Sequence, residues 1–123
     1  MTAQVKIIRA KDFIKATPEG DLDLAKSQAL LLNIGAATTA LQDYAVILDT
    51  RRAESKLSAY ELWYLASELQ KMSDSSLRRT AIICPEKRFE RAKFFALCAE
   101  GKGFEMRAFV TFEEAMDWLN SFD

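Results

Sequence analysis

The sequence predicts an α/β sandwich in which helices pack on a mostly parallel sheet of about five strands. The main observation is that short apolar runs alternate with segments whose apolar residues recur at helical spacing. A second observation is that the runs at 45–48 and 80–84 are apolar without alternation, as is typical of inner parallel strands covered on both faces. The 123 residues, 50% of them hydrophobic, favour a single domain that spans residues 1–123.

The first residues predict a hairpin-like start. Residues 5–9 and 13–16 are short strand-like runs. Pro18, Glu19 and Gly20 follow the second run, and this combination predicts a turn. The chain is therefore expected to form two short strands before its first helix.

A first helix is predicted over residues 24–41. Asp23 stands at the N-cap position, where its carboxylate can accept from a free backbone N–H group. Gly35 weakens the middle of the segment. The apolar residues at helical spacing are Leu30, Ile34, Ala37 and Leu41.

Three more apolar stripes at helical spacing predict the remaining helices. The stripe between the two inner strands consists of Leu62, Leu65, Ala66, Leu69 and Met72. The next stripe consists of Phe89, Ala92, Phe95, Ala96 and Ala99. Gly101 and Gly103 end that helix, and residues 106–110 form the last strand. The last stripe consists of Phe112, Ala115, Met116 and Leu119.

The charge of the chain argues against several kinds of partner. The 17 basic and 18 acidic side chains leave a net charge of −1, so no overall field attracts nucleic acid or anionic lipid. The N-terminus lacks the apolar run of a signal peptide, and no segment approaches the roughly 20 apolar residues of a membrane span. We therefore expect a cytoplasmic protein without a membrane span.

The composition also argues against an enzyme. Histidine, the usual general base near neutral pH and the commonest metal ligand, does not occur in the sequence. Cys84 and Cys98 have neither the number nor the spacing of a disulfide framework or a metal site. We therefore expect no catalytic residue, no metal and no cofactor, and we expect Cys84 to be buried and structural.

Asp49 ends one of the inner strands, which is also the position of the phosphoacceptor in receiver domains. Those domains need further acidic residues after the first strand for Mg²⁺ and a lysine after a later strand, and this sequence has neither in place. The sequence therefore favours a structural role in which Asp49 binds backbone amides of the adjacent loop.

Basic residues follow the carboxyl ends of the two inner strands. They are Arg51, Arg52, Lys87, Arg88 and Arg91. Open parallel sheets bind ligands at this edge, so convergence of these side chains would form a rim for a phosphate, a carboxylate or an acidic partner. Glu54, Glu86 and Glu90 are interspersed, so the alternative is a solvated face of mutual ion pairs.

Three short motifs, taken with the order of the elements, carry a family resemblance. They are residues 20–23 (GDLD) before the first helix, residues 46–50 (VILDT), and Ser58 at the start of the next helix. Together they resemble the STAS domain family, and in particular its SpoIIAA-like group of anti-sigma-factor antagonists. The resemblance covers nearly the whole chain and implies a bacterial-type regulatory domain.

Ser58 has two interpretations. In the STAS family a partner kinase phosphorylates a serine at this distance from the strand, and the resemblance places that phosphosite at Ser58. Leu57, Ala59 and Tyr60 stand where the family has an aspartate, a second serine and a glycine. The residues themselves predict a helix cap, because Ser58 and Glu61 form an S-x-x-E capping box.

Tyr60, Trp63 and Tyr64 place aromatic bulk on the side of their predicted helix that is opposite the leucine stripe. Either another part of the chain folds over them, or they form an interface for another subunit or protein. The sequence favours the interface, because a peripheral helix normally covers its sheet with one apolar stripe only.

The favoured function is a non-enzymatic regulatory or scaffolding domain that acts through protein contacts, as a homodimer. One alternative is a module for a small anionic or lipid-like ligand at the arginine-rich edge. The general similarity of SpoIIAA-like folds to the lipid-binding CRAL-TRIO domains supports that alternative. A further alternative is a phosphorylation-switched regulator of the anti-sigma-factor-antagonist type.

Overall fold

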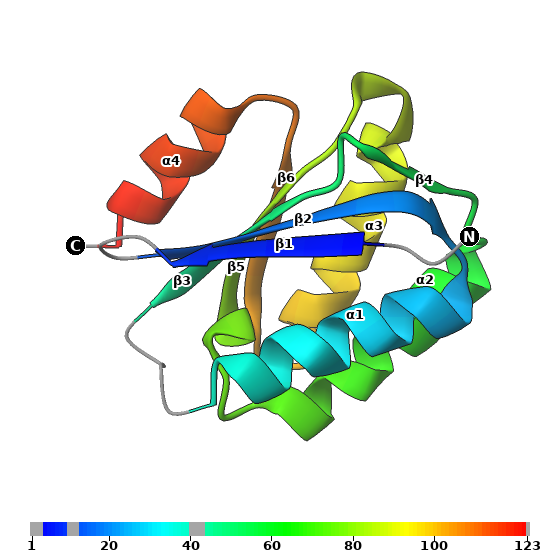
Figure 1. Cartoon of the computed structure of the whole chain (residues 1–123), viewed down its shortest axis with the longest axis horizontal. Coiled ribbons are helices and arrows are strands. Elements are labelled where there is room, and N and C mark those ends of the chain that lie inside the picture. Colours follow the sequence, from blue (N-terminus) through cyan, green and yellow to red (C-terminus); the bar gives the residue numbers. More distant parts are fainter. Residues whose placement is uncertain (1–3, 10–12, 40–43, 123) are drawn as a thin grey trace.

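A mixed sheet with helices on both faces forms the structure (Figure 1). The computed structural model describes residues 4–9, 13–39 and 44–122. The strands are β1 (Gln4–Arg9), β2 (Phe13–Leu22), β3 (Ala45–Asp49), β4 (Ala53–Ser55), β5 (Arg79–Ile83) and β6 (Glu105–Phe109). The α-helices are α1 (Leu24–Ala37), α2 (Ala59–Ser67), α3 (Phe89–Glu100) and α4 (Phe112–Asn120). Three short 3₁₀ helices are η1 (Glu68–Met72), η2 (Ser76–Arg78) and η3 (Glu86–Arg88).

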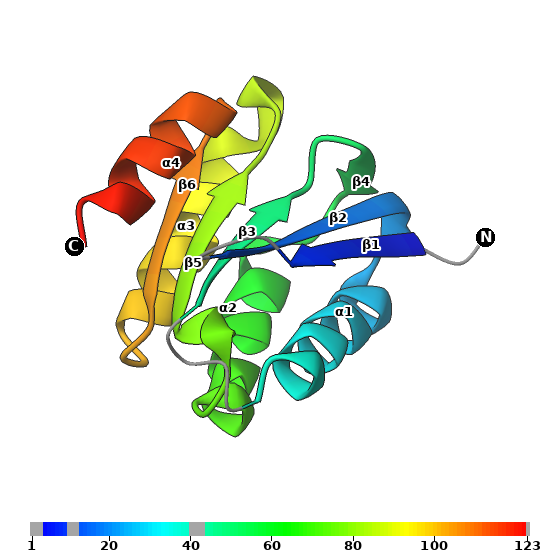
Figure 2. The same ribbon diagram turned by 60° about the vertical axis from the view of Figure 1, so that its left-hand side comes forward.

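Five of the strands are hydrogen-bonded in the order β1-β2-β3-β5-β6. β1 is antiparallel to β2, and every other neighbouring pair in this order is parallel. Figure 2 shows the twist of the sheet, with β1 and β6 running in clearly different directions. The predicted α/β fold with a mostly parallel sheet is confirmed, and so is the pairing of the first two strands.

The turn predicted at residues 18–20 is wrong, because these residues lie inside the long strand β2. Pairing of β2 with β3 ends at Ala16, and pairing of β2 with β4 begins at Gly20. Pro18 lies where β2 is paired with neither of these strands, so its missing N–H removes no hydrogen bond to them. Gly20 has a φ of +89°, a left-handed value that glycine adopts without strain. The short strand β4 that pairs here is not predicted by the sequence.

Helix α1 begins at its predicted cap. The Oδ1 atom of Asp23 accepts a hydrogen bond from the backbone N–H of Lys26 at 2.8 Å. The helix ends where the hydroxyl of Thr38 donates to the carbonyl oxygen of Ile34 at 2.7 Å. Leu41, the last apolar residue of the predicted helix, lies outside the described residues.

Gly35 in α1 allows η1 to approach the helix closely. A Cβ atom at this position would lie only 2.8 Å from Cγ of the buried Met72. The residue that weakens the helix by its flexibility therefore stabilises the packing of α1 against η1 by its small size.

Two hydrophobic cores lie on the two faces of the sheet. Helices α1, α2 and α3 cover one face, and α4 covers the other (Figure 1). Strand β3 contributes to both cores, with Val46 and Leu48 in the first and Ala45 and Ile47 in the second. All five residues of β3 are buried, as predicted for an inner strand.

The predicted apolar stripe of α2 and η1 faces the first core. Its members are all buried: Leu62, Leu65, Ala66, Leu69 and Met72. In the described part of the chain, no helix combines the length and the apolar character that a membrane crossing requires.

Candidate functional site

A small apolar cavity lies at the carboxyl edge of the sheet, and we call it the edge cavity. Its volume is about 100 Å³. Strands β2, β3 and β5 and helices α1, α2 and α3 each supply part of its apolar wall, through Leu22, Leu48, Ile82, Leu30, Leu62 and Phe95. Parallel strands joined by helical crossovers bring their carboxyl ends to one edge, which is why six elements meet around this space.

Arg88 clamps the loop after β3 to the start of α3. Its Nη2 atom donates hydrogen bonds to the carbonyl oxygens of Thr50, at 2.7 Å, and Ala53, at 2.8 Å. Arg88 also lines the edge cavity, and its Nε–H group is buried without a hydrogen-bond partner among the described residues. A buried donor without an acceptor costs about 1–3 kcal/mol. The side chain is therefore a structural clamp that retains one unused donor.

Arg91 makes a similar contact one turn further along α3. Its Nη1 atom donates to the carbonyl oxygen of Leu57 at 2.7 Å. Arg88 and Arg91 are three residues apart, so they lie on the same side of the helix, and both line the edge cavity. Three hydrogen bonds from two arginines thus fix residues 50–57 to α3.

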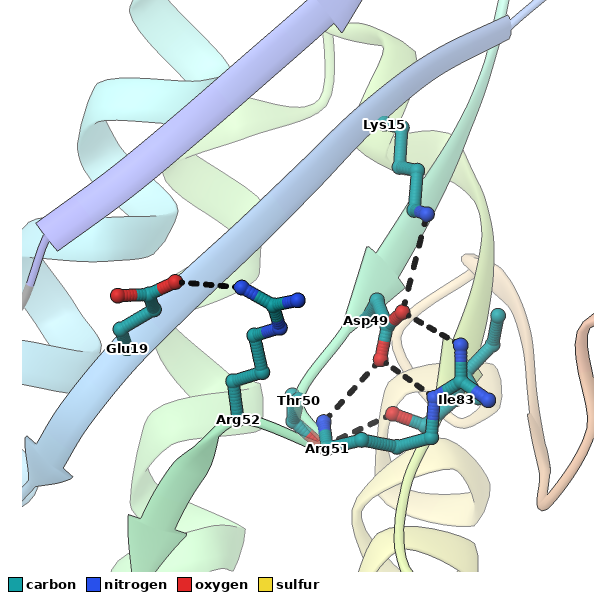
Figure 3. Close-up of polar contacts among 7 residues, drawn as sticks. All are labelled: Lys15, Glu19, Asp49, Thr50, Arg51, Arg52 and Ile83. Carbon is teal, nitrogen blue, oxygen red and sulfur yellow. Dashed lines mark hydrogen bonds and ion pairs between the residues drawn. The ribbon is translucent and has the colours of Figure 1, made fainter.

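The other three basic residues singled out in the sequence bind acidic partners instead. Arg52 Nη1 lies 3.2 Å from Glu19 Oε1, and Lys87 Nζ lies 4.0 Å from Glu54 Oε2. Figure 3 shows that Arg51 and its neighbour Arg52 point to different partners. The structure therefore gathers two of the five basic residues at the edge cavity and directs three of them elsewhere.

Asp49, at the end of β3, is buried and lies close to two basic residues (Figure 3). Arg51 donates from Nε to Oδ1 at 3.0 Å, from Nη2 to Oδ2 at 2.8 Å, and from its backbone N–H to Oδ1 at 3.1 Å. Lys15 Nζ lies 3.8 Å from Oδ2. Burial raises the pKa of Asp49, but the hydrogen bonds and the two positive charges outweigh burial, so the pKa lies below its ordinary value. The predicted binding of an adjacent backbone amide by Asp49 is confirmed.

Cys84 lines the edge cavity and is buried. Burial raises the pKa of its thiol, and the nearby charge of Arg88 lowers it only in part. The thiol is therefore protonated near neutral pH, which is the less nucleophilic form. Among residues 4–9, 13–39 and 44–122, no group of three or more His, Cys, Asp or Glu side chains is placed to hold a metal ion.

Ser58 is the N-cap of α2. Its Oγ accepts from the backbone N–H of Glu61 at 3.2 Å, and Glu61 Oε1 accepts from the backbone N–H of Ser58 at 2.9 Å. Leu57 and Leu62 on either side of the cap are both buried in the first core. The predicted capping box is confirmed, while phosphorylation of Ser58 stays a prediction that rests on the family resemblance.

Three aromatic side chains are exposed on the outer side of α2, and we call them the aromatic face. Tyr60 is 71% exposed, Trp63 48% and Tyr64 37%. The ring centroids of Tyr60 and Trp63 lie 6.0 Å apart, with an interplanar angle of 32°. These rings remain open to solvent in the described part of the chain.

Two solved structures resemble the fold over nearly its whole length. An anti-sigma factor antagonist from Mycobacterium paratuberculosis has a TM-score of 0.63 and 18% identity, covering 96% of this chain and 94% of its own. A second structure, an uncharacterized protein with a SpoIIAA-like fold from Shewanella loihica, has a TM-score of 0.58 and 19% identity, covering 95% of this chain and 93% of its own. This chain has the same SpoIIAA-like fold. No protein-family model matches the sequence, and no curated protein matches it.

In this SpoIIAA-like domain, the sequence did not reveal the cavity wall that α1 supplies or the clamps made by Arg88 and Arg91. The spacing of the two arginines was an available signal, because residues i and i+3 lie on one side of a helix. The acceptors of these arginines cannot be predicted from the sequence, because they are backbone carbonyl oxygens and every residue has one.

The cap predicts how substitutions of Ser58 change stability. Ser58→Ala should lower the free energy of unfolding by about 1 kcal/mol, because the N–H of Glu61 loses its acceptor. Ser58→Asp should leave it nearly unchanged, because aspartate caps equally well and its charge suits a helix N-terminus. Chemical denaturation measures the free energy of unfolding of both variants. The control is Thr111→Ala, which removes the equivalent cap of α4. Loss of partner binding in Ser58→Asp at unchanged stability, with phosphorylated Ser58 in the native protein, would contradict a purely structural role.

The buried carboxylate predicts a pH dependence of stability. Asp49→Asn should lower the free energy of unfolding at neutral pH by about 1–3 kcal/mol, because the charge-assisted hydrogen bonds from Arg51 weaken. Since the pKa of Asp49 is lowered in the folded state, its contribution is complete above the ordinary value of 3.8 and disappears as the pH falls through the folded-state pKa. The stability difference between wild type and variant should therefore shrink in acid, as measured by urea denaturation at several pH values. Asp117→Asn, on the exposed side of α4, is the control. A difference that stays constant into strong acid would mean that the charge of Asp49 contributes nothing.

Proposed function

We propose that this chain is a non-enzymatic regulatory domain of the STAS type that acts through protein contacts. The aromatic face of α2 is the observation that carries this proposal. Tyrosine and tryptophan are enriched at protein interfaces, because each combines a large apolar ring with a polar group. A peripheral helix normally buries one stripe and presents polar residues to solvent. Three exposed aromatic residues on the outer side of α2 therefore favour a binding partner at that side.

The structural neighbours support a regulatory role. The Mycobacterium paratuberculosis protein shares the fold over almost the whole of both chains, and its name describes a protein that opposes another protein, an anti-sigma factor. Binding of one protein by another is also the activity that the aromatic face suits.

The reactive groups of the chain support a non-enzymatic role. The sequence has no histidine to act as a base. The thiol of Cys84 is buried with a raised pKa, and the Oγ of Ser58 is engaged in a helix cap. These groups are poor candidates for nucleophilic catalysis, which needs an activated nucleophile beside a base.

The partner that best fits the aromatic face is a second copy of the chain. The three aromatic residues carry no charge, and one turn further along, Lys71 Nζ neutralises Glu68 Oε2 at 2.8 Å. Two copies related by a two-fold axis would therefore meet without like-charge repulsion. Such pairing would remove apolar surface from water, which stabilises the pair by about 25 cal/mol per Å².

Self-association predicts the effect of charges placed on the aromatic face. The double variant Tyr60→Glu, Tyr64→Glu should be a folded monomer, because two buried carboxylates per copy would face each other across the two-fold axis. Sedimentation velocity should show a dimer for wild type and a monomer for the variant, with unchanged circular dichroism. Leu97→Glu, at an exposed apolar position on α3, is the control and should remain dimeric.

Two results would contradict the proposal in different ways. A wild-type protein that sediments as a monomer throughout the micromolar range would exclude self-association. Unfolding of the double variant would place Tyr60 and Tyr64 in the core rather than at an interface.

A further inference from the structure

We propose that the edge cavity binds a small amphipathic carboxylate, with its hydrocarbon part against the apolar wall and its carboxylate at Arg88 and Arg91. This inference goes beyond the proposed contact function and concerns a different surface. The cavity lies on the inner side of α2, where Leu62 and Leu65 line it, whereas the aromatic face lies on the outer side.

The size and the wall of the cavity select a short hydrocarbon chain. Its volume of about 100 Å³ is somewhat smaller than that of an apolar cavity of about 150 Å³ that binds benzene. A ligand with about six carbon atoms is therefore a suitable size for a first probe. Burial of hydrocarbon against leucine, isoleucine and phenylalanine side chains is favourable, whereas burial of a polar chain without hydrogen bonds is not.

The charged groups at the cavity all have one sign. Arg88 and Arg91 line it, and none of the described lining residues is acidic. The neighbouring carboxylates of Asp49 and Glu19 do not weaken this selectivity, because they are paired with Arg51 and Arg52 and do not line the cavity. An anion is therefore the complementary ligand.

The two arginines retain donors that a carboxylate can use. In Arg88, Nη2 is occupied by two backbone carbonyl oxygens, and Nε is too deeply buried to reach a ligand, so Nη1 is the donor that remains. In Arg91, Nη1 binds the carbonyl oxygen of Leu57. The planar guanidinium group suits the two oxygens of a carboxylate. Because the clamps already hold both side chains in place, little side-chain freedom is lost on binding.

A carboxylate fits these donors better than a phosphate monoester does. A phosphate carries close to two charges near neutral pH and presents three acceptor oxygens. Two arginines that already donate to backbone carbonyl oxygens offer few further donors at the apolar cavity. A carboxylate needs fewer partners, so it is desolvated at lower cost.

Hexanoate is the probe that tests this proposal, in calorimetric titrations of the full chain. Hexanoate should bind with a negative heat-capacity change and should raise the melting temperature. Four further compounds each change one property of hexanoate. Acetate shortens the hydrocarbon part, hexanol removes the charge, hexylamine reverses the charge, and hexyl phosphate replaces the carboxylate by a phosphate. Each of these four should bind at least about tenfold more weakly than hexanoate.

Three variants place the ligand at the edge cavity. Arg91→Gln should weaken hexanoate binding about tenfold, because a charge-assisted hydrogen bond is lost. Arg52→Gln removes the same charge away from the cavity and should change nothing. Ala92→Phe fills the cavity from α3 and should abolish binding although both arginines are retained. Circular dichroism of each variant separates loss of binding from loss of folding. If Arg91→Gln does not fold, Ala92→Phe still tests whether hexanoate binds in the edge cavity.

Several results would overturn the proposal. Absence of heat and of a melting shift with millimolar hexanoate would exclude the ligand. Equal binding of hexanol would exclude a role for the arginines, and tighter binding of hexyl phosphate would exclude the carboxylate. Unchanged binding in Ala92→Phe would place the ligand outside the edge cavity.

Discussion

The carboxyl edge of the sheet, where the edge cavity lies, depends on the hydrogen bonds from Arg88 to the carbonyl oxygens of Thr50 and Ala53. Residues 50–57 leave β3, form β4 and lead to the cap of α2, so their position determines where that helix begins. Hydrogen bonds from a charged donor contribute about 1.5–3 kcal/mol each, more than neutral ones. The Arg88 clamp therefore holds α3, the edge cavity and the start of α2 in one arrangement.

Helix α2 connects the two surfaces for which we propose functions. Its inner side completes the edge cavity through Leu62 and Leu65, and its outer side carries the aromatic face. The helix has only nine residues, and isolated helices shorter than about 12–15 residues are marginal in water. Its stability therefore depends on the Ser58 cap and on packing against its neighbours, and both surfaces share this dependence.

Part of this structure can be predicted from the sequence. Inner strands such as β3 are predictable, because burial on both faces leaves an unbroken apolar run. The turn at 18–20 is mispredicted, because proline and glycine are also tolerated where a strand changes its partner. Strand β4 is short and mostly polar, and it exists only through its pairing with β2. The directions of the basic side chains depend on partners far away in sequence, such as Glu19 for Arg52 and Ala53 for Arg88, so the sequence could supply candidates only.

Native-state hydrogen exchange of an Arg88→Met variant tests the central role of this clamp most directly. Methionine keeps much of the apolar stem and removes the guanidinium group, and Arg52→Met is the matched control on an exposed ion pair. If Arg88 fixes residues 50–57, their amides should lose protection selectively, with β5 still protected as in wild type. Unchanged protection of residues 50–57, or an equal loss throughout the sheet, would contradict this role of Arg88.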